Sequence, residues 1–556
     1  MSSILAAMMK DLSKTGLADL DLKSPFTIPS GIVTTVPSVI ARIAHDVPAI
    51  GFLTTKTLSS EPRSGYREPV LHEYYPGCFV NAVGLANPGA RNFLRAMQPL
   101  LPLHDNKPLI VSIMGKGAEE FLECAHILDP IADAFELNLS CPHVKGAGQN
   151  IGSDPDAVRA IIRLLKQHLQ KPVIPKLSPN IGDIPGMARM CEAEGADALC
   201  LINTVGPGVA TDADGNPVLT NMAGGVSGAG ILPIGLKSVR EAASSVNIPI
   251  IAAGGITSAE DVRAYRKAGA SLFSVGSALA GLPTSQVADY FQSLVDALAG
   301  TSAPISSAPR SPGHARMTYF KTRVVENTSF GPGLFRLRFE EGPPCAPGRF
   351  LFLRLPGVGE KPFSPALDRE PIYLVRSVGP FTRALEQLKP GDPIFMRGPY
   401  GKGFPKPQPG STVVLIAGGT GAAPIMLAAA YWRESVSRAF FGFSDKVSGS
   451  FQDEILAEIP SACVAIDPPG RIGEVVRLLA EDIAMQPTLY AECKIFICGP
   501  GPMVDAVLAV LGEKTPRERI FVAREDIMRC GIGLCGSCGT KSGLRSCVDG
   551  PVMHPE

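Results

Sequence analysis

Residues 1–300 alternate short apolar runs with amphipathic stretches, and this alternation limits the possible folds more than any other feature. Amphipathic helices are expected between the runs, as in Asp156–Leu169 and Ser258–Ala268. Strands that alternate with helices form parallel sheets, and the length fits one (β/α)8 barrel. We therefore predict a TIM barrel over residues 1–300. Its expected strands are Ala49–Thr54, Leu109–Met114, Ala134–Leu139, Val173–Lys176, Ala198–Ile202, Ile248–Ala252 and Leu272–Val275.

The chemistry of such barrels lies at the C-terminal ends of the strands. Glycine turns after the seventh and eighth strands, here Gly254-Gly255 and Gly276-Ser277, are typical phosphate cradles because backbone N–H groups are unobstructed there. Two lysines, Lys56 and Lys176, also end strands, and a cation at such a position can stabilise an anionic reduced flavin. Together these features predict bound FMN.

A cysteine follows the strand that ends in Asn138-Leu139. Cys141 stands on a loop before Pro142 and His143, where a thiol can act as a general base or nucleophile. The alternative is a buried structural thiol, which is the commoner role of a lone cysteine. The sequence alone leaves both interpretations open.

The second half begins after a tether. Residues 301–316 are rich in Pro, Ser and Ala, which is typical of a linker between independently folded domains. Short strands separated by Gly/Pro turns follow and predict a small antiparallel β-barrel over residues 317–410. These expected strands are Thr318–Val325, Leu334–Phe339, Arg349–Leu355, Ile372–Val378 and Pro393–Arg397.

Residues 411–525 return to strand–helix alternation. The expected strand Val413–Ala417 leads into the glycine turn Gly418–Gly421 and a helix, a pattern that lets a pyrophosphate approach the helix N-terminus. A second strand leads into Gly499-Pro500. The uncharged stretch Thr412–Trp432 is long enough for a membrane span, but its glycines and Pro424 favour strand, turn and helix.

Four cysteines near the C-terminus follow the spacing C-x4-C-x2-C-x8-C, and its opening is that of plant-type [2Fe–2S] sites. A disulfide group or a zinc clip is the alternative, although zinc sites more often use two short C-x2-4-C pairs. A cluster domain over residues 526–556 would transfer single electrons, so it requires a donor and an acceptor. The expected ligands are Cys530, Cys535, Cys538 and Cys547.

The charge composition predicts no nucleic-acid or membrane partner. Lys+Arg and Asp+Glu number 52 each, so no net field attracts phosphate backbones or anionic lipids. The apolar patch Met1–Met9 is too short to span a bilayer, and no secretory signal is recognisable. We therefore expect a cytoplasmic protein whose scattered cysteines are reduced.

The barrel half resembles the class 1 dihydroorotate dehydrogenases. The matching motifs are Asn81–Gly89, Asn138–Pro142, Lys176–Asn180, Ile202–Thr204, Gly224–Gly228 and Gly254-Gly255. The resemblance implies that orotate stacks on FMN and that Cys141 removes the C5 proton of dihydroorotate while a hydride leaves C6. It implies substrate contacts from Lys56, Asn81, Val83, Gly84, Leu85, Asn138, His143, Asn203 and Thr204. It implies FMN contacts from Gly31, Lys56, Thr57, Asn138, Lys176, Ile202, Gly228, Gly254, Gly255, Gly276 and Ser277.

One position departs from this family. Many members have Asn after Cys-Pro, whereas this chain has His143, as the dihydropyrimidine dehydrogenases do. The uracil or thymine reductases are therefore the alternative. The Asn81–Gly89 stretch resembles the orotate enzymes, so orotate is the preferred substrate.

Residues 317–556 resemble the electron-transfer subunit of class 1B dihydroorotate dehydrogenase, a ferredoxin-reductase-like protein. The motif Lys361–Ser364, which alone could be a surface turn, lies between two expected strands. The resemblance implies FAD contacts from Lys361, Pro362, Phe363, Ser364, Gly379 and Thr382. It implies NAD contacts from Gly418, Gly419, Thr420, Gly421, Cys498, Gly499 and Pro500.

The two resemblances together predict a fused, NAD-linked dihydroorotate dehydrogenase. Electrons would pass from FMN to the [2Fe–2S] cluster, then to FAD and NAD+. The family also implies a homodimer formed through the barrel. A non-catalytic flavoprotein that relays electrons is the rival of another class, against which Cys141, Lys56 and Lys176 argue.

Overall fold

The structure is a computed structural model that describes residues 17–18, 20–139, 151–300, 317–331, 333–367, 371–444, 449–467 and 473–556. It contains two compact units. The first comprises Met1–Arg316 with Ile532–Arg545, and the second comprises Met317–Gly531 with Ser546–Glu556. Cys535 and Cys538 thus lie in the part of the C-terminal segment that belongs to the first unit. The linker predicted at residues 301–316 lies outside the described residues.

An eight-stranded parallel sheet forms the centre of the first unit, in the order β1-β12-β11-β8-β7-β6-β5-β2. The edge strands meet where the Gly51 amide donates to the Phe26 carbonyl at 2.9 Å, which closes the barrel. The predicted TIM barrel is confirmed. Its strands are β1 (Phe26–Thr27), β2 (Leu53–Thr54), β5 (Leu109–Ile113), β6 (Ala134–Asn138), β7 (Val173–Leu177), β8 (Leu199–Leu201), β11 (Ile250–Ala253) and β12 (Leu272–Ser274).

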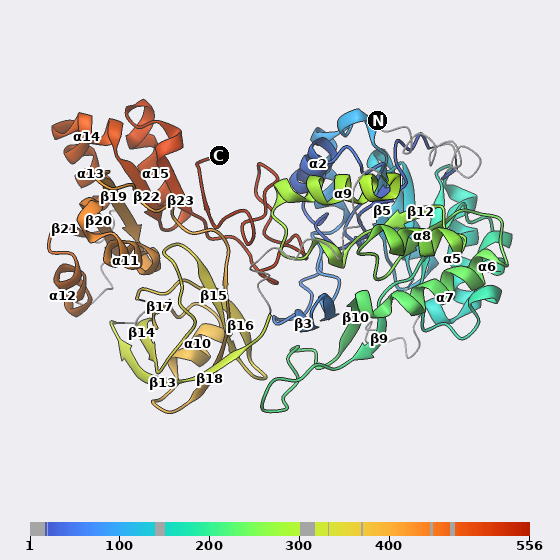
Figure 1. Cartoon of the computed structure of the whole chain (residues 1–556), viewed down its shortest axis with the longest axis horizontal. Helices are drawn as coiled ribbons and strands as arrows, with labels where there is room; N and C mark the ends of the chain where they lie inside the picture. Colours follow the sequence, from blue (N-terminus) through green and yellow to red (C-terminus); the bar gives the residue numbers. More distant parts are fainter. Residues whose placement is uncertain are drawn as a thin grey trace. The chain divides into compact units, whose positions relative to one another are not determined.

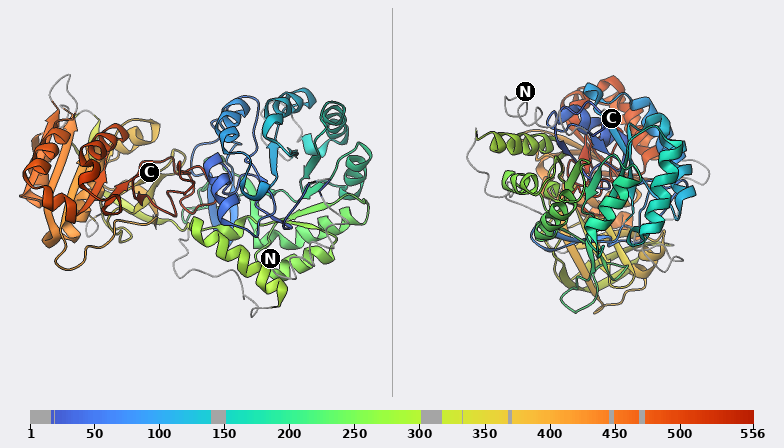
Figure 2. Two further views of the ribbon diagram at one scale, coloured as in Figure 1. Left: turned by 90° about the horizontal axis from the view of Figure 1, so that it is seen from above. Right: turned by 90° about the vertical axis from the view of Figure 1, so that its right-hand side faces the viewer.

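Helices surround these strands as an outer ring (Figures 1 and 2). Local sequence explains where these helices begin. Asp154 caps α5 by accepting from the Asp156 amide, and Pro155 occupies the first turn of that helix. Ser258 forms a capping box with Asp261 at the start of α8. The helices are α2 (Pro37–Asp46), α3 (Ala90–Met97), α4 (Ala118–Leu128), α5 (Pro155–His168), α6 (Ile184–Ala193), α7 (Leu232–Ala243), α8 (Ala259–Lys267) and α9 (Thr284–Ala299).

The barrel interior changes character along the strands. Near their N-terminal ends the inward side chains form an apolar cluster that includes Ile110, Ala134 and Ile174. Two residues further along the same strands stand Ser112, Glu136 and Lys176, each at most 6% exposed. Since strand side chains alternate, these polar residues also face inward, toward the C-terminal ends where barrel chemistry occurs.

A second, antiparallel sheet in the first unit was not predicted. Its order is β3-β4-β10-β9, built from Leu71–Tyr75, Cys78–Asn81, Gly224–Gly228 and Val205–Gly208. Asn81 ends β4 opposite Gly225, and its side chain donates to the Gly225 carbonyl at 3.1 Å. This sheet therefore fixes the position of one predicted substrate ligand.

The second unit begins with the predicted antiparallel sheet, in the order β16-β15-β18-β13-β14-β17. The motif at Lys361 lies between β15 and β17 as predicted, but Lys361, Pro362 and Phe363 belong to a strand that was not predicted, β16, which pairs with β15. This edge strand has no apolar alternation to reveal it. The strands are β13 (Phe320–Ser329), β14 (Leu334–Phe339), β15 (Phe350–Leu355), β16 (Gly359–Phe363), β17 (Ile372–Arg376) and β18 (Pro393–Tyr400), with α10 (Pro380–Glu386) following β17.

The remaining sheet, β21-β20-β19-β22-β23-β24, is parallel except for β24. Apolar clusters cover both of its faces. The stretch Thr412–Trp432 forms strand, turn and helix as predicted, and no helix in the described part of the chain is long and apolar enough to cross a membrane. The elements are β19 (Val413–Gly418), α11 (Ala422–Tyr431), β20 (Val436–Ser444), α12 (Gly449–Glu458), β21 (Ala462–Asp467), α13 (Glu474–Met485), α14 (Pro487–Glu492), β22 (Lys494–Cys498), α15 (Gly501–Leu511), β23 (Ile520–Ala523) and β24 (Val552–Met553).

Candidate functional site

One cavity of about 260 Å³ opens at the C-terminal ends of the barrel strands. A single water needs only ~10–15 Å³ of such space, so the cavity is of ligand size. Cys141 and His143 lie outside the described residues, and their roles stay predictions. Every other predicted FMN or substrate residue lines the cavity: Gly31, Lys56, Thr57, Asn81, Val83, Gly84, Leu85, Asn138, Lys176, Ile202, Asn203, Thr204, Gly228, Gly254, Gly255, Gly276 and Ser277.

Glycines keep the phosphate end of the cavity open. Gly254 and Gly255 directly follow β11 with φ of 112° and 78°, in the region that side chains rarely adopt. A Cβ at Gly254 would lie 2.9 Å from Ile202, and one at Gly276 would lie 2.8 Å from Pro29. The backbone here has the form expected of a phosphate cradle, and these residues fit FMN.

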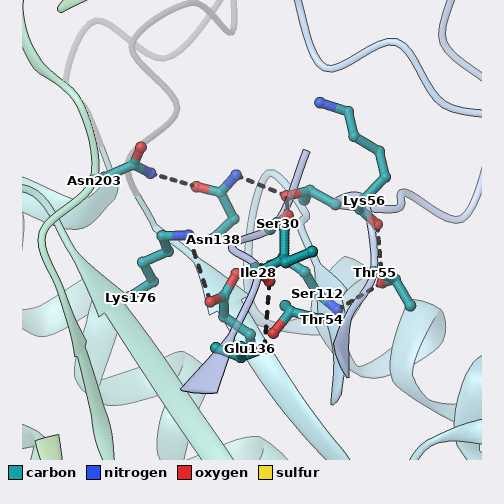
Figure 3. A network of polar contacts seen from close by, with 12 residues as sticks. Ile28, Ser30, Thr54, Thr55, Lys56, Ser112, Glu136, Asn138, Lys176 and Asn203 are labelled. Atoms are coloured by element: carbon teal, nitrogen blue, oxygen red, sulfur yellow. Dashed lines mark hydrogen bonds and ion pairs between the residues drawn. The ribbon is translucent and has the colours of Figure 1, made fainter. Parts of the chain in front are cut away.

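Two lysines face the predicted flavin position. Lys176 pairs with the buried Glu136 at 3.5 Å. Burial alone would lower the pKa of Lys176, but the Glu136 charge, with a smaller contribution from Cys200, outweighs it and raises the pKa. Lys56 extends away from this pair (Figure 3), and a Cβ at Gly31 would lie 3.0 Å from its Nζ. A charged lysine in a buried site suits an anionic ligand.

Two asparagine side chains meet at the cavity wall. Asn138, the last residue of β6, donates to the Thr57 hydroxyl at 3.0 Å. Asn203 donates to the Asn138 carbonyl oxygen at 3.4 Å (Figure 3). It also accepts from the Thr204 amide at 2.8 Å. Amide groups held in this way can recognise the alternating N–H and C=O groups of a pyrimidine ring.

Sequence reasoning missed a cation and an aromatic ring in the cavity lining. Arg63 and Tyr66 both line the cavity, near the turn in which Gly84 and Leu85 adopt φ of 70° and 55°. Within the described part of the chain, the buried Nε of Arg63 has no hydrogen-bond partner. An arginine beside the turn predicted to hold the substrate carboxylate fits an anionic substrate. No sequence motif marks Arg63.

The cavity also has lining residues from the distant C-terminal segment. Leu534 and Cys535 contribute to its wall. The Val33 amide donates to the Leu534 carbonyl at 2.7 Å, and the Thr35 hydroxyl donates to the Cys535 carbonyl at 2.7 Å. The segment with the predicted cluster ligand Cys535 is therefore part of the wall of the predicted FMN site, which the sequence did not indicate.

Arg545 fastens the same segment to the barrel. This fully buried side chain donates to the carbonyls of Gly533 at 2.6 Å and Leu282 at 2.8 Å, and to the Thr284 hydroxyl at 3.2 Å. A guanidinium carries five N–H donors in a rigid fork, so one side chain can hold the loop and the start of α9 together.

The four predicted cluster cysteines are all buried. In the second unit, Arg397 donates to the Cys530 carbonyl at 2.8 Å. Among the described residues, no three His, Cys, Asp or Glu side chains are placed as ligands of a metal ion. The donor set of four cysteines is nevertheless the one that iron–sulfur clusters require, so the residues fit a cluster chemically.

The predicted FAD residues come together in the second unit. Phe363, at the end of β16, packs on Phe381 with ring centroids 6.4 Å apart. The Thr382 hydroxyl accepts from the amides of Val378 at 2.9 Å and Gly379 at 3.0 Å, so it organises this turn. The two motifs predicted for FAD thus meet in space, while their role stays a prediction.

The two predicted NAD turns lie against each other. A Cβ at Gly421 would lie 2.4 Å from the Cys498 carbonyl oxygen, and one at Gly499 would lie 3.1 Å from the Gly418 amide. Both turns follow the neighbouring parallel strands β19 and β22, where the strand order reverses, and such switch points bind dinucleotides. A methyl group at Gly419 would lie 4.0 Å from the Arg376 guanidinium, a phosphate-binding candidate that sequence reasoning missed.

Comparison with known proteins agrees with the barrel geometry. The family model described as dihydroorotate dehydrogenase matches residues 12–294, which is over half of the chain. The chain belongs to the dihydroorotate dehydrogenase family. A second model, the iron-sulfur cluster binding domain of dihydroorotate dehydrogenase B, matches residues 525–556.

Curated relatives of the dihydroorotate dehydrogenase family carry the name dihydroorotate dehydrogenase B (NAD(+)), catalytic subunit. The Pyrococcus horikoshii protein is 42% identical over 273 residues, which are 49% of this chain and 88% of the relative. The Thermococcus kodakarensis protein is 42% identical over 264 residues, 47% of this chain and 85% of the relative. Each of these matches covers about half of this chain, and the FAD and NAD assignments rest on the motifs above.

Proposed function

We propose that this protein oxidises dihydroorotate to orotate in pyrimidine biosynthesis and passes the electrons to NAD+. The observation that carries the proposal is the single barrel cavity that gathers every described residue predicted for FMN or substrate. The names of the relatives support the same reaction. The cytoplasmic location and the homodimer stay predictions.

The residues of the cavity have distinct proposed roles. Asn81, Asn138 and Asn203 hydrogen-bond the pyrimidine, and the turn at Val83–Leu85 with Arg63 receives the carboxylate. Lys176, kept charged by Glu136, balances negative charge on the isoalloxazine. Cys141 removes the C5 proton as a general base. This division of roles accounts for each kind of polar group in the cavity.

Residues 317–556 are proposed to carry the electrons onward. When bound, FMN would accept a hydride, the [2Fe–2S] cluster would transfer single electrons, and FAD would transfer a hydride to NAD+. The lining of the FMN cavity by Leu534 and Cys535 supports this path, because it brings the cluster-binding segment to the flavin site. The paired glycine turns after β19 and β22 support a dinucleotide site.

Anaerobic reduction of the protein-bound flavin tests the proposal. Dihydroorotate should bleach the flavin absorbance and NAD+ should restore it, whereas dihydrouracil should do neither. Bleaching by dihydrouracil alone would assign the dihydropyrimidine reaction, to which the sequence Cys141-Pro142-His143 points. Bleaching by neither substrate would refute both.

The role of Cys141 has a matched control. Cys141→Ser should slow flavin reduction by roughly two to four orders of magnitude, the loss expected when a general base is removed. Cys124→Ser changes a buried thiol on α4 that does not line the cavity, and it should reduce flavin at the parental rate. Equal rates in the two variants would show that Cys141 is not the base.

A further inference from the structure

A buried polar layer crosses the barrel interior beneath the cavity. Ser112, Glu136 and Lys176 occupy inward positions that branched apolar residues fill in most such barrels. Ser112 and Glu136 are register partners on β5 and β6. A buried carboxylate is costly unless it is paired and hydrogen-bonded, so this layer needs an explanation beyond packing.

A continuous chain of hydrogen bonds leads from Glu136 to the cavity wall (Figure 3). The Ser112 hydroxyl donates to Glu136 Oε1 at 2.9 Å, and the Ser112 and Thr57 oxygens are 3.0 Å apart. Thr57 Oγ1 accepts from Asn138 Nδ2 at 3.0 Å and lies 2.9 Å from the Ser30 hydroxyl. The other carboxylate oxygen of Glu136 faces Lys176 at 3.5 Å.

The direction of this chain follows from counting protons. An ionised carboxylate only accepts, and a hydroxyl has one proton to donate. The Ser112 proton goes to Glu136, so Ser112 must accept from Thr57. The Thr57 proton is then used, so Thr57 accepts from Asn138 and from Ser30. Every bond in the chain points toward the carboxylate.

This polarity determines how the Asn138 amide is turned. Its nitrogen faces Thr57, and its carbonyl oxygen accepts from Asn203 at 3.4 Å. We propose that Glu136 is a positioning residue that acts through Ser112 and Thr57 to fix the orientation of the Asn138 amide for pyrimidine binding. This inference rests on the proposed function, because it names the group that orients a substrate-binding amide.

Replacement of Glu136 by glutamine makes a specific prediction. The Gln carbonyl would turn toward Lys176, which can only donate, and the Gln nitrogen would then donate to Ser112. Ser112 would then donate to Thr57, so the Thr57 proton would no longer be committed to Ser112 and could go to Ser30 or to the Asn138 carbonyl oxygen. The Asn138 amide would no longer be held in one orientation, and in the turned orientation its nitrogen would face the Asn203 nitrogen, so that two donors oppose each other.

Orotate binding to the FMN-loaded protein, followed by the change in flavin absorbance, measures the effect. Glu136→Gln and Ser112→Ala should each weaken binding on the order of 10- to 100-fold, the cost of a misdirected or unpaired buried amide. Because both residues act through one chain, the double variant should bind orotate no less tightly than whichever single variant binds it less tightly. Thr57→Ser keeps the hydroxyl, so it should bind at least roughly tenfold more tightly than Thr57→Val.

The control is Glu194→Gln, which alters a carboxylate paired with Arg163 outside the cavity and should bind orotate as the parent does. If Glu136→Gln loses FMN, orotate binding by Ser112→Ala, Thr57→Ser and Thr57→Val tests the relay instead. Parental binding in Ser112→Ala and Thr57→Val, or multiplying losses in the double variant, would overturn the relay alone. A parent protein that binds no orotate would overturn the relay and the proposed function together.

Discussion

Arg397 is the side chain of the second unit whose replacement should cost the most stability. It is fully buried, donates to Glu360 through Nε at 3.0 Å and Nη2 at 2.5 Å, and donates to the Tyr400 hydroxyl at 3.0 Å. Its guanidinium also stacks 3.8 Å from the Phe352 ring centroid. Burial alone would lower the pKa of Arg397, but the Glu360 carboxylate outweighs it and raises the pKa, so Arg397 stays charged.

Arg397→Met would leave the Glu360 carboxylate buried without its cation. Breaking a buried pair in this way costs about 3–5 kcal/mol. For a unit of this size, each kcal/mol lowers the melting temperature by about 2–4 °C, so we expect a fall of about 6–20 °C. The variant also loses the donor to the Cys530 carbonyl, so iron content should fall as well.

Calorimetry of the second unit's thermal transition measures this loss. Arg338→Met is the control, because its pair with Glu326 is about one-third exposed and such pairs contribute about 0–1 kcal/mol. Adding Glu360→Gln to Arg397→Met removes the buried unpaired charge. The double variant should therefore lose less unfolding free energy than the two single variants lose together, by about 0.5–3 kcal/mol. An Arg397→Met transition no lower than that of Arg338→Met would refute the reasoning.

Three further predictions follow from the site geometry. Arg545→Met should slow NAD+ reduction more than flavin reduction by dihydroorotate, because it releases the cluster segment from Leu282; equal slowing of both steps would contradict this. The hydroxyl of Thr328 and the guanidinium of Arg336 lower the pKa of Glu326 to about 2. The stability that this group contributes is therefore present above pH 4.5 and is lost as pH falls toward 2. The melting temperature of Glu326→Gln should fall less on acidification than that of the parent protein. Serine at any one cluster cysteine should reduce iron content while dihydroorotate still reduces FMN, and parental iron in all four variants would rule out Cys530, Cys535, Cys538 and Cys547.

The sequence predicted the barrel because seven of its strands are apolar runs followed by helices with clear periodicity. It missed the strand β1, since two residues, Phe26 and Thr27, carry no pattern. It also missed the sheet β3-β4-β10-β9, in which β9 and β10 consist largely of glycine and small residues rather than apolar alternation. Pairing with other segments, rather than local propensity, makes these residues strands.

The described site residues were predicted from motifs that end strands and from the family resemblance, and two polar residues within strands escaped this search. Glu136 and Ser112 stand inside apolar runs, where they look like isolated exceptions. The signal that could have revealed them is their position: each lies two residues beyond an inward apolar residue on its strand, on the same face. The place of Leu534 and Cys535 in the cavity wall could not be found from the sequence, because the hydrogen bonds from Val33 and Thr35 join positions some five hundred residues apart.

The buried layer and the cavity above it have one electrostatic explanation. A cavity that receives an anionic cofactor and an anionic substrate needs cations, and here Lys176 stands at its buried end. A buried lysine tends to lose its proton, so it needs an adjacent carboxylate, which Glu136 provides at 3.5 Å. That carboxylate has a second oxygen to satisfy, and Ser112 satisfies it. Under the proposed function, the hydrogen-bond chain to Asn138 is a consequence of keeping one lysine charged, and the sides of the cavity predicted to bind cofactor and substrate share a single anion.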